Sequence, residues 1–155
     1  MYLGIDSSSK AVHIVSLDGN GKIKFKVKLA SKEPTAPLRF LELVDALFIY
    51  FEKPTGLKFV AVEQAIYVQN PQTTLALAKV LAAIEICLYK AGIEYKFVQN
   101  KTWKKEILKN GGAKKEDILA FAKNTWPKED FNEQDFADSA CIALWGLKFF
   151  KEGEI

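Results

Sequence analysis

Acidic side chains stand at the ends of two apolar segments and at the start of a helical one. Asp6 follows the apolar run Tyr-Leu-Gly-Ile, and Glu63 follows Phe-Val-Ala-Val. Asp135 and Asp138 are three residues apart, which places both side chains on one face of a helix. A carboxylate at the end of an apolar strand is costly unless something neutralises it, so the four acids predict one shared cation site. This arrangement indicates divalent metal ions and phosphodiester chemistry.

Each acid also has a simpler interpretation when it is taken alone. An Asp in front of the Ser7-Ser8-Ser9 turn often caps its own backbone, and acids in the first turn of a helix favour the helix dipole. Glu63 is harder to explain in this way, because Val60-Ala61-Val62 buries the chain up to it, although a paired core Glu is an alternative. Small residues at positions 137, 139 and 140 would let the last helix approach the sheet closely, so the combination of acids is more specific than any one of them.

The segment from residue 99 to residue 128 is strongly basic. Its eight lysines against three acids give it a charge of +5, whereas the whole chain carries only +3. We expect the lysines around its glycine loop to contact nucleic acid, namely Lys104, Lys105, Lys114 and Lys115. Four further lysines alternate along residues 22–28, and we interpret these as protection of an exposed sheet edge.

Hydrophobic patterns and turn signals predict five strands and five helices. The strands are expected at residues 2–6, 11–17, 22–29, 58–63 and 94–98. The helices are expected at residues 38–51, 72–91, 102–109, 114–124 and 133–150. Three antiparallel strands followed by alternating helices and strands is the order of the ribonuclease H-like α/β fold, a five-stranded mixed sheet with helices on both faces. In that fold the strand with Asp6 is central and lies beside the strand with Glu63.

Bulk composition limits the class of protein. A chain of 155 residues with 49% hydrophobic content fits one domain, residues 1–155. The longest apolar stretch, residues 75–88, contains two charges and is shorter than the roughly 20 residues of a membrane span. The N-terminus begins with a strand, so no targeting signal is expected. Cys87 and Cys141 lie in apolar helical patterns, which indicates buried free thiols and a cytoplasmic protein.

The segments around the acids resemble the RuvC-type Holliday junction resolvases. That family has a Gly-Ile-Asp strand, an Ile/Val-Glu-Gln strand end and an Asp-x-x-Asp helix, which are similar to residues 4–6, 62–64 and 135–138 here. The resemblance covers nearly the whole chain. One departure is Ser7-Ser8, where relatives commonly have Pro-Gly, and it concerns the shape of the loop rather than the acid.

The resemblance implies a role for each group of residues. The four acids would be the catalytic ligands of two Mg²⁺ or Mn²⁺ ions, and Lys104 and Lys115 would balance the charge of the phosphate. In the resolvases the loop after the Glu carries a residue that disturbs base stacking at the crossover. Ile66 or Tyr67 would serve here, unless that side chain folds onto the core. This scheme needs no protein base, and we expect the single histidine, His13, to be structural.

The helix expected at residues 72–91 is apolar around most of its circumference. One face of a sheet cannot cover that much surface. A two-fold dimer would cover the rest and would supply the two active sites that symmetric cleavage of a junction needs. Alternatively, neighbouring helices of the same chain bury it.

The sequence therefore predicts a homodimeric, metal-dependent endonuclease that cuts branched DNA such as four-way junctions and forks. One alternative is an RNA-directed nuclease of the same fold, since the acids do not distinguish RNA–DNA hybrids from junctions. Another is a non-catalytic branched-DNA binding module, which the acids disfavour because a pure binder gains little from negative charge facing phosphate. Sugar kinases and actin-like ATPases have a similar first strand but need two such domains.

Overall fold

The centre of the protein is a five-stranded mixed sheet in a computed structural model that describes residues 1–52, 56–64 and 70–153. The strands are β1 (Tyr2–Ser7), β2 (Ala11–Leu17), β3 (Ile23–Ala30), β4 (Phe59–Glu63) and β5 (Tyr95–Val98). Their order across the sheet is β3-β2-β1-β4-β5. The first three strands pair antiparallel, while β4 pairs parallel to β1 and β5 parallel to β4. The predicted mixed sheet with a central first strand is confirmed.

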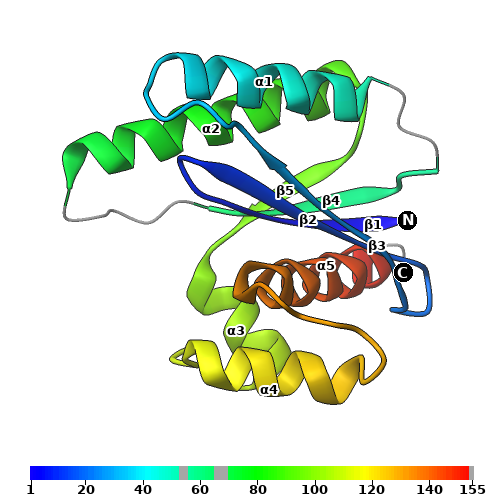
Figure 1. Ribbon diagram of the computed structural model, residues 1–155. Coiled ribbons are helices and arrows are strands. Elements are labelled where there is room, and N and C mark those ends of the chain that lie inside the picture. Colours follow the sequence, from blue (N-terminus) through cyan, green and yellow to red (C-terminus); the bar gives the residue numbers. More distant parts are fainter. Residues whose placement is uncertain (53–55, 65–69, 154–155) are drawn as a thin grey trace.

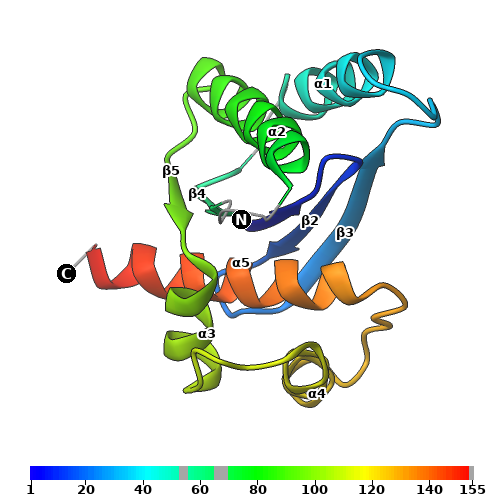
Figure 2. The ribbon, with the colours of Figure 1, turned by 90° about the vertical axis from the view of Figure 1, so that its left-hand side faces the viewer.

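Helices cover both faces of this sheet (Figure 1). The helices are α1 (Leu38–Phe51), α2 (Pro71–Lys90), α3 (Asn100–Leu108), α4 (Lys115–Thr125) and α5 (Gln134–Gly153). α1 and α2 lie on one face, and α5 lies on the other with α3 and α4 outside it, as the second view also shows (Figure 2). The predicted elements agree with these bounds to within three residues at each end.

The alternation of side chains in β1 and β4 decides which way the strand acids point. Leu3, Ile5 and Val62 belong to the core under α1 and α2. Because successive residues of a strand face opposite sides, Asp6 and Glu63 point toward the face covered by α5. Ile5 pairs with Val62 across the two parallel strands, so the two acids leave neighbouring strands side by side.

Glycine allows α5 to pack directly against β1. A Cβ at Gly4 would lie 2.1 Å from the carbonyl oxygen of Ser139 and 2.2 Å from the amide nitrogen of Ala143. Both are backbone atoms in the middle of a helix, so neither can move aside cheaply. The small residues predicted to allow this approach, at positions 137, 139 and 140, are fully buried. The missing side chain at position 4 therefore sets the distance between β1 and α5.

α2 begins and ends with the expected signals. The side chain of Asn70 accepts hydrogen bonds from the amides of Gln72 and Thr73, and Gly92 follows the helix with φ of +66°. In the described part of the chain, α2 is the one helix long and apolar enough to cross a membrane, by length and composition alone, a test that a core helix also passes. About a third (33%) of the most apolar 18-residue stretch of α2 is buried inside the protein. Ile84 and Leu88 are among its buried residues and pack in the core with β1.

Both cysteines are buried free thiols, as predicted. Cys87 belongs to the core under α1 and α2, and Cys141 to the core under α5. Burial raises the pKa of each thiol, so neither is reactive at neutral pH.

The first prediction concerns Gly4. Substitution of Gly4 by Ala should lower the free energy of unfolding by roughly 3 kcal/mol, because the added methyl group overlaps the backbone of α5. Urea denaturation followed by circular dichroism measures this quantity. Gly19→Ala is the matched control, since nothing lies within 4 Å of a Cβ at that position. Equal stability of the two variants would contradict the proposed role of Gly4.

Candidate functional site

Three of the four predicted acids meet where α5 begins, at the end of the central strand. One carboxylate oxygen from each of Asp6, Asp135 and Asp138 lies within 4.8 Å of the other two. Asp135 is in the first turn of α5, and Asp138 follows on the same face of that helix. Two oxygens bound to one Mg²⁺ lie about 3–4 Å apart, since each bond measures about 2.1 Å. A cation would therefore require only a small contraction of this group.

Glu63 borders the three aspartates and is held by two donors. Its Oε2 accepts a hydrogen bond of 2.6 Å from the indole Nε1 of Trp103. The Nδ2 atom of Asn100 lies 3.2 Å from both of its carboxylate oxygens. After burial, the negative charge of Glu63 is the largest cause of the raised pKa of both Asp6 and Asp138. The fourth acid thus belongs to the same electrostatic site, although it is outside the group of three.

The acids are hard to ionise together. Burial, and then the charge of Glu63, raises the pKa of Asp6 well above its usual value and that of Asp138 to about 6. Oδ1 of Asp138 is also buried, with no hydrogen-bond partner among the described residues. A divalent cation would satisfy this oxygen and cancel the repulsion between the carboxylates. An all-oxygen set of donors fits Mg²⁺ or Mn²⁺.

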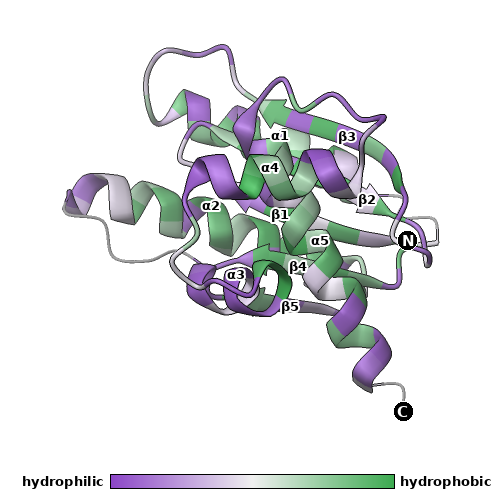
Figure 3. Cartoon of the chain, turned by 90° about the horizontal axis from the view of Figure 1, so that it is seen from below, coloured by the Kyte–Doolittle hydropathy of each residue, from purple (hydrophilic) through white to green (hydrophobic). Residues whose placement is uncertain are grey.

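Lysines of α3 and α4 lie next to the acids. Lys115 lowers the pKa of Asp6 and Lys104 lowers that of Asp138, in both cases against the stronger effect of burial. Two further lysines are exposed: Lys105 is on α3, and Lys114 comes directly before α4. Seen from below the view of Figure 1, α3 and much of α4 are hydrophilic, while α5 behind them is largely hydrophobic (Figure 3). The basic segment therefore borders the acidic group.

Two lysines of β3 do more than protect the sheet edge. β3 is an edge strand, as expected. However, Nζ of Lys26 lies 3.2 Å from the carboxylate of Glu129, and Nζ of Lys28 lies 2.9 Å from that of Glu133. Both acids belong to the loop between α4 and α5. The two ion pairs fasten this loop to the sheet immediately before the acids of α5.

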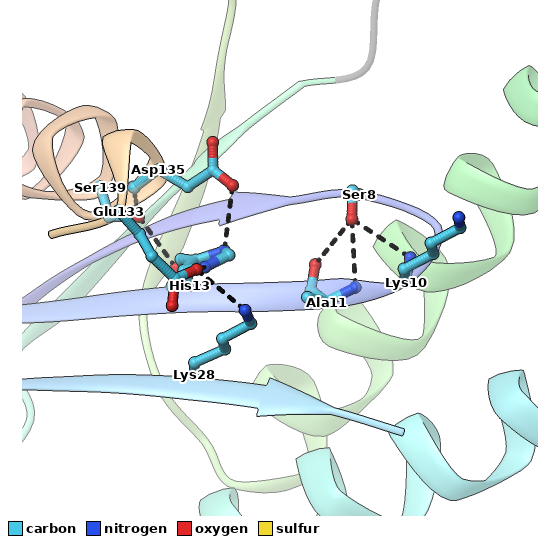
Figure 4. Close-up of polar contacts among 8 residues, drawn as sticks. All are labelled: Ser8, Lys10, Ala11, His13, Lys28, Glu133, Asp135 and Ser139. Atoms are coloured by element: carbon cyan, nitrogen blue, oxygen red, sulfur yellow. Dashed lines mark hydrogen bonds and ion pairs between the residues drawn. The ribbon is translucent and has the colours of Figure 1, made fainter. Parts of the chain in front are cut away.

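Sequence reasoning missed the side chains that hold the acids. Asn100 and Trp103 follow β5, and Val98 of β5 pairs with Glu63, so the residues after this strand necessarily come close to Glu63. That pairing is the signal that could have found them. His13 pairs with Asp6 across β1 and β2, and its Nδ1 lies 3.6 Å from the carboxylate of Asp135 (Figure 4). Ile66 and Tyr67, the predicted wedge residues, lie outside the described residues.

Comparison with known protein families gives the site its context. A sequence model of the family described as "Crossover junction endodeoxyribonuclease RuvC" matches residues 3–145, which include all four acids. The chain belongs to the RuvC family. A RuvC protein of Synechocystis sp. is 25% identical over 152 residues, covering 94% of this chain and 90% of its own length. A RuvC protein of Sulfurovum sp. is 29% identical over 157 residues, covering 96% of each chain.

Solved structures of a RuvC protein and of a mitochondrial resolvase have the same fold. RuvC of Thermus thermophilus in complex with a Holliday junction substrate is similar with a TM-score of 0.79 and 18% identity, over 97% of this chain and 94% of that one. The yeast mitochondrial Holliday junction resolvase Ydc2 is similar with a TM-score of 0.59 and 17% identity, over 97% of this chain and 83% of that one. These likenesses confirm the predicted ribonuclease H-like fold.

The second prediction concerns the stability of this RuvC-family protein without metal. A carboxyl group whose pKa is raised by folding stabilises the protein below its unfolded pKa, and that stability is lost as the pH rises through the folded value. For Asp138 the two values are 3.8 and about 6. In EDTA, the melting temperature should therefore fall between pH 5 and pH 8, and Mn²⁺ should restore it at pH 8.

Asp138→Asn tests the cause of this effect. It removes one of the repelling charges with little change in shape, so in EDTA at pH 8 it should raise the melting temperature by roughly 5 °C and reduce the stabilisation by Mn²⁺. Asp45→Asn, at an exposed position of α1, is the matched control and should change neither quantity. A native protein that is as stable at pH 8 as at pH 5 in EDTA would refute the repulsion.

Proposed function

We propose that this chain is a metal-dependent endonuclease that resolves Holliday junctions and other branched DNA by phosphodiester hydrolysis. The observation that carries the proposal is the convergence of Asp6, Asp135 and Asp138, with Glu63 beside them, in a member of the RuvC family. The relatives from Synechocystis and Sulfurovum bear the name of crossover junction endodeoxyribonucleases, and the Thermus structure contains a Holliday junction substrate. We assign this activity to one cytoplasmic nuclease domain, residues 1–155.

The proposed reaction uses the four acids to hold two Mg²⁺ or Mn²⁺ ions. The three aspartates lie within reach of one ion, and Glu63, on the neighbouring strand, would complete the ligands of the pair. Such ions, when bound, activate the attacking water and stabilise the leaving 3′ oxygen. Trp103 and Asn100 donate to the carboxylate of Glu63 and so fix its orientation.

The basic surface of α3 and α4 is our candidate for the contact with the DNA backbone. Lys104 and Lys115 oppose the charge of the acids, so they also lie close to where a scissile phosphate would bind. Lys105 and Lys114 extend the positive surface outward. Ile66 or Tyr67 would disturb base stacking at the crossover.

We further propose that the protein is a two-fold dimer with α2 in its interface. The outer side of α2 has large apolar side chains that the described residues leave exposed: Leu75, Ile86 and Tyr89 are 58%, 48% and 78% exposed. Leu81 is only 8% exposed, and Leu77 packs against the core under α1 and α2. Apolar residues therefore cover both sides of α2, and a second copy of the chain would bury the outer side and bring a second active site.

The third prediction tests the proposed activity. Labelled four-way junction, fork, duplex and RNA–DNA hybrid are incubated with the protein in Mg²⁺, Mn²⁺ or EDTA. The junction should be cut in either metal and left intact in EDTA. Asp6→Asn and Glu63→Gln should each slow cleavage by more than about 100-fold while junction binding persists, because a metal ligand is lost with little change in shape.

Asp45→Asn, an exposed change from Asp to Asn on α1, is the control and should cut like the native protein. Full activity of both active-site amide variants would refute the assignment of the acids. Preferential cleavage of the RNA–DNA hybrid would place the chain among RNA-directed nucleases of the same fold.

The fourth prediction tests the dimer. Ile86→Glu introduces a charge on the outer side of α2, and burial of an unpaired carboxylate opposes association. The variant should sediment as a monomer and should lose paired incision of a junction. Gln72→Glu, at an exposed polar position of the same helix, should remain dimeric. The proposal fails if the native protein sediments as a monomer at micromolar concentration, free and on a junction, yet makes paired cuts.

A further inference from the structure

His13 has a closely packed position beside the acids. It lies in β2, on the face covered by α5, and the residue is 4% exposed. Its ring stands edge-on to the ring of Phe136, with centroids 5.0 Å apart and an angle of 85° between the planes. The hydroxyl of Ser139 donates a hydrogen bond of 3.0 Å to the carbonyl oxygen of His13 (Figure 4). Packing thus leaves the ring little freedom to move.

Both nitrogens of this ring face carboxylates, one from the loop just before α5 and one from the first turn of that helix. Nε2 lies 2.9 Å from Oε2 of Glu133, and Nδ1 lies 3.6 Å from Oδ2 of Asp135. The same oxygen of Glu133 also accepts a hydrogen bond of 2.9 Å from Nζ of Lys28. As Figure 4 shows, Lys28, Glu133 and His13 form a chain of contacts from β3 through the loop to the ring, and this chain ends at Asp135.

Asp135 is the acid that most needs such support. Asp6 and Glu63 are held by strand backbone in the sheet, and Asp138 is largely buried on α5. The side chain of Asp135 is 46% exposed in the first turn of the helix. Among the described residues, His13 is the one basic side chain within 4 Å of its carboxylate. Loss of His13 would therefore remove the one basic partner that the described residues offer this carboxylate.

We propose that His13 is a positioning residue for the metal centre, which holds the carboxylate of Asp135 toward Asp6 and Asp138 and is itself held by Glu133 and Lys28. This inference rests on the proposed function, because it takes Asp135 as a metal ligand. Partners that orient a ligand typically change metal affinity by 10- to 100-fold when they are removed, so the ring should matter for the metal more than for the fold.

The geometry separates this role from two others. A general base must reach a water molecule, but the ring of His13 is buried and both of its nitrogens face carboxylates. A direct ligand would have a ring nitrogen within 4.8 Å of the carboxylate oxygens of all three aspartates, and among the described residues the group of ligand atoms that meets this limit does not include His13. Orientation of Asp135 is the role that the contacts support.

Calorimetric titration of Mn²⁺ into the metal-free protein, without DNA, tests the proposal. His13→Ala should raise the dissociation constant for Mn²⁺ by about 10-fold or more, because Asp135 loses its partner. Val15→Ala is the matched control, since Val15 is a buried apolar residue of the same strand and face, in the core under α5. It should bind Mn²⁺ like the native protein. Thermal melts define a temperature at which all variants are folded.

Glu133→Ala provides a second variant that does not disturb the core. The side chain of Glu133 is 38% exposed, so this change should fold normally, and it should weaken Mn²⁺ binding several-fold by releasing the ring of His13. Unchanged Mn²⁺ affinity in both His13→Ala and Glu133→Ala would overturn the proposal. An equal loss of affinity in Val15→Ala would also overturn it, because the effect would then come from the fold.

The titration also separates this inference from the proposed nuclease activity. If the native protein binds Mn²⁺ and cuts no branched DNA, the proposed function fails while the role of His13 is still decided by the variants. If the native protein binds no Mn²⁺, the metal centre and the role of His13 fail together.

Discussion

The structure depends on the direct contact between the backbone of α5 and the central strand β1. Gly4 makes this contact possible, because any side chain there would collide with the peptide groups of Ser139 and Ala143. The contact brings the first turn of α5 to the point where β1 delivers Asp6, so that carboxylates more than 120 residues apart in sequence share one small volume. A side chain at position 4 would push α5 away from β1 and so move Asp135 and Asp138 away from Asp6. Backbone packing in the core therefore has a direct chemical consequence at the surface.

The close approach of several carboxylates is unfavourable by itself. The groups around the acids counter this repulsion only in part. Burial and mutual repulsion favour the protonated forms of Asp6 and Asp138. Lys104 and Lys115 only partly oppose that effect, whereas a divalent cation would remove it. Two neutral donors, Asn100 and Trp103, fix Glu63 without cancelling its charge. The loop before α5 is fastened by Lys26 and Lys28. Residues of several elements thus hold the acids in place. These contacts do not neutralise the carboxylates, so a metal ion could still bind them.

α2 gives the other face of the sheet a different character. One side of this helix packs in the core, and the opposite side presents large apolar side chains to solvent. Surface of that kind is unusual on a monomer and is typical of an interface between chains. The site and this surface lie on opposite faces of the sheet (Figure 1), with α5 bearing two of the acids and α2 the apolar side. Association through α2 would therefore leave the faces that carry α3, α4 and the acids open to DNA.

The sequence by itself determined the elements, their order in the sheet, the acids and their family. Each of these follows from local patterns: apolar alternation ending in an acid, helical spacing, a glycine that ends α2, and small residues where α5 meets β1. The tertiary structure decided what the patterns leave open. It placed Leu81 inside and Ile86 outside on a helix that is apolar on both sides, gave Trp103 and Asn100 to Glu63, and turned Lys26 and Lys28 from edge protection into anchors of a loop. It also placed His13 against Asp135. These contacts join segments that are distant in the chain, and their partners are fixed by strand register and helix packing rather than by any local signal.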